Sequence, residues 1–128
     1  MRADTSEWIE KAEEDWHVLL VLYRARKHPT HNAVCFHAQQ CAEKYLKARL
    51  IESNVFFPKI HDLIALLILV LPLEPNWTLY QPDLDALNKY AVECRYPGFS
   101  ATREHAKHAL SICRRIREVA RHSLDLPV

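Results

Sequence analysis

Polar and basic side chains recur on one side of a predicted helix at about residues 32–53. Placed at 100° steps, four of them lie within an arc of about 80°: His37, Gln40, Lys44 and Lys47. Amide and imidazole groups can hydrogen-bond a base or a ribose, and an ammonium group can neutralise a phosphate. The same spacing also suits a solvent-exposed face on which Glu43 and Lys47 form an ordinary pair. The stripe is therefore a candidate lining of a nucleotide or RNA groove, with a solvated helix face as the alternative.

A second pair of residues has side chains suited to chemistry on RNA. Cleavage of RNA without metal needs a general acid or base that titrates near neutral pH and a cation for the developing phosphorane charge. Arg103 and His108 are five residues apart on a predicted helix, a separation of about 140° that long side chains could bridge. Alternatively, both residues face solvent. These two residues are the catalytic candidates of the sequence.

The other histidines form no recognisable metal site. Two pairs have the spacing of metal ligands, but no local cysteine or carboxylate set completes either one: His28 with His31, and His105 with His108. His61 directly precedes Asp62, which is expected to cap a short helix, with His61 hydrogen-bonded beside it. No metal and no cofactor are predicted.

Helical periodicity supplies the elements that must position these residues. Apolar residues recur every three or four positions from Trp8 to Tyr23, with helix caps expected at Asp4, Thr5 and Ser6. Further helices are expected at about 32–53, 63–71, 83 or 85 to 93, and from 100 or 102 to beyond 121. The stretch 72–82 contains three prolines and is predicted to be an irregular but packed loop. The fold class is all-α, an antiparallel up-and-down four-helix bundle with an additional short helix.

Composition agrees with one helical domain. The chain has 128 residues, which fits a single domain over 1–128, and 49% are hydrophobic, which excludes intrinsic disorder. The single glycine, Gly98, argues against all-β folds and removes every glycine-rich phosphate loop. Net charge is only +1, but residues 95–128 hold seven basic and three acidic residues, a surplus of +4. That surplus indicates either a solvated helix face or a surface that faces phosphate.

Charge and cysteine usage indicate the compartment. Acidic residues throughout the first twenty positions are unlike a secretory signal. The longest apolar run, 63–71, has nine residues, against about 20 needed to span a bilayer. The cysteines form no C-x-x-C pair and are expected to be buried thiols: Cys35, Cys41, Cys94 and Cys113. A soluble cytoplasmic protein without a membrane partner is expected.

The segment from Phe36 to Ala48, FHAQQCAEKYLKA, resembles the signature of the HEPN domain family. Three further segments match that family in the same order, so the resemblance covers essentially the whole chain: Trp8–Trp16, Lys59–Leu63 and Cys94–Pro97. The resemblance implies an antiparallel helical bundle, usually a homodimer. It also implies, for many members, action with a minimal nucleotidyltransferase partner, often as a toxin–antitoxin pair.

Some members of that family are metal-independent ribonucleases that carry an arginine, four to six residues and then a histidine. Arg95 resembles the motif arginine, but the allowed partner positions hold Ser100, Ala101 and Thr102, so the pattern is broken. The resemblance therefore favours a nucleotide- or RNA-binding module, with a ribonuclease toxin and a protein-binding scaffold as alternatives. The candidate binding residues are His37, Gln40, Lys44, Lys47, His61, Arg95 and Tyr96.

Overall fold

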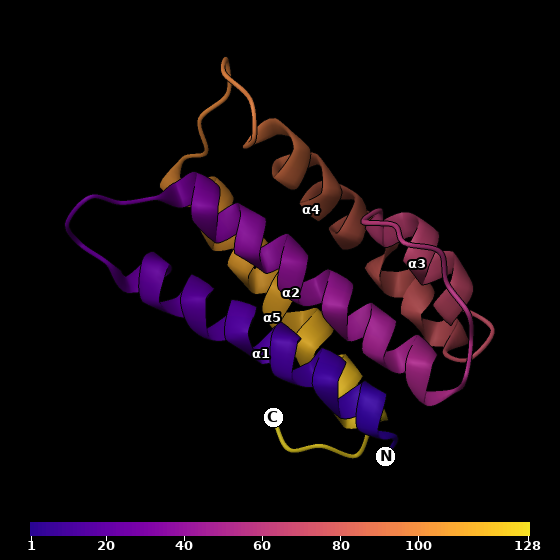
Figure 1. The fold of residues 1–128 in the computed structure, drawn as a ribbon. Helices are drawn as coiled ribbons and strands as arrows, with labels where there is room; N and C mark the ends of the chain where they lie inside the picture. Colours follow the sequence, from indigo (N-terminus) through magenta and orange to yellow (C-terminus); the bar gives the residue numbers. More distant parts are fainter.

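The computed structural model describes residues 1–128 and contains helices but no β-strands. Five α-helices and one 3-10 helix follow each other: α1 (Ala3–Arg24), α2 (His31–Glu52), α3 (Leu63–Val70), η1 (Pro75–Tyr80), α4 (Gln81–Glu93) and α5 (Arg103–Ser123). The consecutive helices α1 and α2 run antiparallel, as do α4 and α5 (Figure 1). The predicted all-α class is confirmed, with four longer helices and the short helix α3.

Helix α2 lies at the centre of the fold and packs against each of the other four α-helices. Twelve of its 22 residues are buried, so it has no single apolar face. Ala38, Ala42 and Ala48 are fully buried, and their small side chains let neighbouring helices approach closely. Because α2 is enclosed on most sides, its polar side chains must find partners within the protein.

The short helix α3 is held at its start by a side-chain cap. The carboxylate of Asp62 accepts hydrogen bonds from the backbone N–H groups of Ile64, at 2.9 Å, and Ala65, at 3.4 Å, as the sequence predicts. Four of its eight residues, all of them apolar, are buried, whereas Ile68 is 62% exposed. None of the helices is both long and apolar enough to cross a membrane.

Two helix starts differ from the prediction. Helix α1 begins at Ala3 with Arg2 at its N-cap and no side-chain cap, so Asp4 lies in the first turn rather than before it. In the first turn, the carboxylate of Asp4 still interacts favourably with the partial positive charge at the N-terminal end of the helix. Helix α4 begins at Gln81 and has Pro82 in its first turn, where a missing N–H costs nothing.

The prediction of an irregular loop over residues 72–82 is wrong in part. Residues 75–80 form the 3-10 helix η1, and Trp77 is buried, so the segment is packed as expected. Helix α5 begins directly after the second of its two predicted starts, 100 and 102. Thr102 caps it by accepting from the backbone N–H of His105, whose side chain accepts from the N–H of Thr102 in return.

A charged network ties α1 to α2 and α5. Glu13 receives two hydrogen bonds from Arg117, at 2.7 and 2.8 Å, and one from the hydroxyl of Tyr45. Arg121 donates to that hydroxyl at 3.0 Å. Burial alone raises the pKa of Glu13, but the hydrogen bonds from Arg117 and Tyr45 outweigh it and bring the pKa below its usual value.

This network predicts a pH-dependent stability. The pKa of Glu13 is lower in the folded protein than in the unfolded chain. Its carboxylate therefore stabilises the fold fully at any pH above the unfolded-state pKa, and this contribution is lost as the pH falls through the folded-state pKa. Glu13→Gln should lower the free energy of unfolding by about 1 kcal/mol at neutral pH. Urea denaturation should show this difference shrinking in acid, whereas the exposed, unpaired Glu14 gives a neutral control in Glu14→Gln. A difference that is independent of pH would contradict the account.

Candidate functional site

A polar pocket of about 320 Å³ lies between α2, the residues that precede α3, and α4. Its lining consists of Gln39, His61, Asp62, Asn88, Ala91, Val92 and Arg95. Two of these, His61 and Arg95, are binding candidates from the sequence, and the fold brings them together from distant segments. The volume is within the usual range for small-molecule sites.

One wall of the pocket is a single face of α4 and the turn that follows it. Ala91, Val92 and Arg95 follow Asn88 by three, four and seven residues, which places all of them on one side of the helix. Arg95 is exposed, makes no ion pair, and holds its guanidinium 5.3 Å from the centre of the Phe36 ring on α2. Stacking of this kind positions the cation without neutralising its charge.

The floor of the pocket is a hydrogen-bonded network on α2. Gln39 is only 2% exposed, and its amide donates to the backbone carbonyl of His61 at 2.9 Å and to Glu43 at 3.2 Å. The buried carboxylate of Glu43 also contacts His61 Nδ1 at 3.1 Å and accepts from Lys47 at 3.1 Å. Gln40 donates to the side-chain oxygen of Gln39 at 2.8 Å. These contacts fix the segment that carries His61 against α2.

The rim is held by the cap of α3. Asn88 donates to Asp62 at 2.8 Å and accepts from the backbone N–H of Leu63 at 3.0 Å. Asp62 therefore accepts hydrogen bonds from both α3 and α4. Its carboxylate adds negative charge at the end of the pocket that lies near Asn88, away from Arg95. Neither Asn88 nor Gln39 is a candidate from the sequence. Asn88 precedes the candidate Arg95 by seven residues, a spacing that places both on one helix face and could have identified Asn88.

The four-residue stripe of α2 does not line this pocket together. His37 Nδ1 lies 2.8 Å from Asp15 on α1, and Lys44 donates to the other oxygen of the same carboxylate. Lys47 is only 4% exposed, with its ammonium 5.4 Å from the centre of the Trp8 ring. Three of the four side chains therefore contact α1, through Asp15 and Trp8, rather than the pocket.

The candidate catalytic pair also separates. The guanidinium of Arg103 lies 5.0 Å from the centre of the Tyr23 ring on α1. His108 Nδ1 instead lies 2.8 Å from the hydroxyl of Tyr90 on α4. The two side chains thus face different helices. Tyr96 is 65% exposed and lies outside the pocket lining.

All four cysteines are free thiols; three are buried, as predicted, whereas Cys94 is only half-buried, contrary to the prediction. Burial raises the pKa of Cys35 to about 12, which suppresses its thiolate form. No group of three or more histidine, cysteine, aspartate or glutamate side chains is arranged to hold a metal ion.

Comparison with known proteins places these features in context. The HEPN domain matches residues 5–123 of the chain. A curated relative from Methanocaldococcus jannaschii, named "Putative toxin MJ1304", is 30% identical over an alignment of 96 residues that covers 70% of this chain. The match spans 61% of the length of that relative. No solved structure matches the chain significantly.

Proposed function

This chain belongs to the HEPN domain family, and we propose that it is a toxin-like member that binds a phosphorylated nucleotide in the polar pocket. The nucleotide can be free or form the phosphorylated end of an RNA. The observation that carries the proposal is the meeting of an unpaired cation, Arg95, with the hydrogen-bonding groups of His61 and Asn88 in one cavity. The toxin-like assignment rests on the family and on the printed name of the M. jannaschii relative.

The charges within the pocket suggest how a nucleotide would lie. Arg95 has its N–H groups free for a phosphate, which a guanidinium can grip with two hydrogen bonds. Asp62 lies at the end of the pocket away from Arg95 and repels a phosphate, so this end suits a base or a ribose. There, the exposed imidazole of His61 keeps Nε2 free, and Asn88 keeps one amide N–H beyond its bond to Asp62.

Binding without catalysis fits these residues better than the ribonuclease alternative. Arg95 has no histidine four to six residues further on. Arg103 and His108 face α1 and α4 respectively, so this candidate pair does not meet around one phosphate within one chain.

Removal of the Arg95 charge should weaken nucleotide binding. We expect Arg95→Gln to reduce the affinity for ATP at least tenfold by isothermal titration calorimetry, because a charge-assisted contact contributes about 1.5–3 kcal/mol. Arg115→Gln is the matched control, since Arg115 is exposed and pairs with Asp83 far from the lining. Equal losses in both variants, or no ATP binding by the unaltered protein, would refute the nucleotide site.

The same preparations distinguish binding from cleavage. An RNA incubated with the unaltered protein in EDTA should be recovered intact. Cleavage that persists in EDTA and disappears in His108→Ala would instead establish the ribonuclease alternative.

We also propose that the protein forms a homodimer that acts with a partner of the minimal nucleotidyltransferase type. Exposed apolar side chains support an interface on the α3 side of the fold, where Ile68 is 62% and Leu79 is 72% exposed. Light scattering should give twice the mass of the 15.0 kDa chain, and Ile68→Glu should halve it. The control Val21→Glu, at an exposed position on α1, should remain dimeric.

The partner is tested by co-expression with a minimal nucleotidyltransferase. Co-elution of the two proteins in size-exclusion chromatography supports the pair, and separate elution contradicts it. An unaltered chain that scatters as a monomer would contradict the homodimer.

A further inference from the structure

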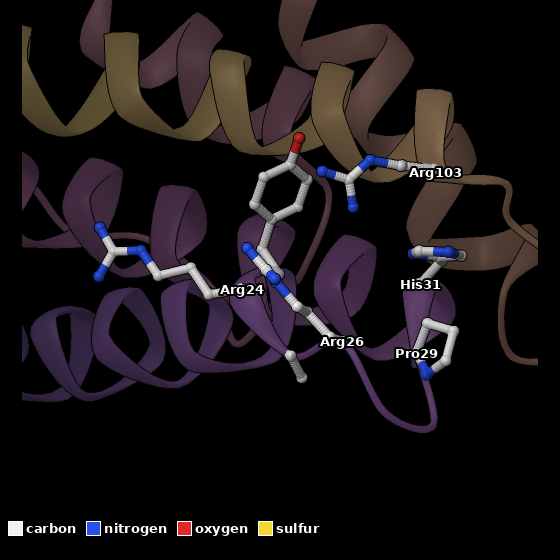
Figure 2. Close-up of a pocket in the computed structure, with 7 residues that line it drawn as sticks. Arg24, Arg26, Pro29, His31 and Arg103 are labelled. Atoms are coloured by element: carbon white, nitrogen blue, oxygen red, sulfur yellow. The ribbon is translucent and has the colours of Figure 1, made fainter.

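A second pocket, of about 590 Å³, opens where the end of α1, the connection to α2 and the start of α5 meet. It is lined by Tyr23, Arg24, Ala25, Arg26, Pro29, His31 and Arg103, without any acidic residue. Figure 2 shows Arg26, His31 and Arg103 around a common space, whereas Arg24 extends away from them along the helix. The pocket shares no residue with the polar pocket between α2 and α4.

The basic residues of α5 fall into two sets. Arg115, Arg117 and Arg121 all have carboxylate partners, in Asp83 or Glu13. Three others make no ion pair and are exposed: Arg103, Lys107 and Arg114. This second set lies within an arc of about 40° and extends about 16 Å along the helix. Their charges are therefore available to a ligand that runs along α5 from the basic pocket.

Aromatic rings of α1 hold two of these cations in place. The guanidinium of Arg103 lies 5.0 Å from the centre of the Tyr23 ring, and that of Arg114 lies 5.8 Å from the centre of the Trp16 ring. Tyr23 and Trp16 are two helical turns apart and pack partly against the core. A stacked guanidinium keeps the N–H donors at its edge free, so it can still bind a phosphate.

The start of α2 adds positive potential at the pocket. Thr30 at its N-cap makes no side-chain hydrogen bond, and the first turn contains no acidic residue. The partial positive charge of the helix end is therefore uncompensated next to His31. On α1, the nearby carboxylates of Glu13 and Asp15 are already paired with cations of α5 and α2.

We propose that this seam between α1 and α5, the basic groove, binds the phosphate backbone of single-stranded RNA; its residues are Arg26, Arg103, Lys107 and Arg114, with Tyr23 and Trp16. Unpaired cations spread over about 16 Å exceed the reach of one phosphate group and suit a chain of them. The half-buried rings of Tyr23 and Trp16 serve to hold the guanidinium groups, and a row of cations that follows the backbone is typical of surfaces that bind single strands with little sequence preference. The groove does not depend on the nucleotide proposed for the polar pocket.

Charge removal at two points of the groove tests this proposal. The double variant Arg103→Gln/Arg114→Gln is compared with Lys89→Gln/Arg115→Gln, which loses the same charge from two residues that are already paired. Fluorescence anisotropy with a short labelled oligouridylate, which has no 5′-phosphate, measures affinity across a KCl series. We expect at least a tenfold loss in the groove variant only. Its salt slope should fall by about 1.4, because each phosphate contact contributes about 0.7.

Competitors and a second variant make the outcome decisive. Unlabelled oligouridylate should displace the probe, whereas ATP and inorganic phosphate at the same phosphate concentration should not. Arg95→Gln should retain oligouridylate binding while it loses ATP, so failure at one site is distinguishable from failure at the other. Thermal melts by circular dichroism verify that the variants are folded. Equal losses in the two double variants, displacement by ATP, or no oligouridylate binding at low salt would overturn the basic groove.

Discussion

Helix α2 is enclosed by the other helices, and each polar group on it must therefore be satisfied inside the protein. Glu43 and Lys47 pair with each other below the surface, and His37 and Lys44 share the carboxylate of Asp15. No buried side-chain nitrogen or oxygen lacks a hydrogen-bond partner. Since an unpaired buried charge costs about 3–5 kcal/mol, the buried pair of Glu43 and Lys47 serves the fold, and Lys44 is likewise engaged by a carboxylate of α1.

The exposed cations on which the two proposed sites rest lie at the ends of helices and along α5. Arg95 follows the last turn of α4, and Arg103 begins α5, so both are exposed and have aromatic rings rather than carboxylates as neighbours. The polar pocket and the basic groove each form around such a cation. The two sites share no lining residue, so our two proposals assign a nucleotide and a nucleic acid strand to separate surfaces of one small helical chain.

Periodicity alone predicts the long helices because apolar spacing determines which segments can bury a face, and Asp62 and Thr102 are recognisable caps. It fails over residues 72–82, since prolines are tolerated in the first turns of η1 and α4. The sequence also predicts an interaction for His61, but not its partners. Gln39 donates to the backbone of His61, 22 residues further along the chain, and no local pattern predicts such a contact. A helical wheel gives the direction in which Lys44 or Lys47 projects from α2, but not the helix or side chain that lies there.

Whether pairing decides which cations meet a ligand is tested most directly by NMR of the side-chain N–H groups. Arginine Nε–H and lysine ammonium resonances would be followed while ATP, and separately oligouridylate, is added. The account predicts shifts at Arg95 with ATP and at Arg103 and Arg114 with oligouridylate, while Lys44 and Lys47 stay unchanged. Shifts at Lys44 or Lys47 with the exposed arginines unchanged would contradict it.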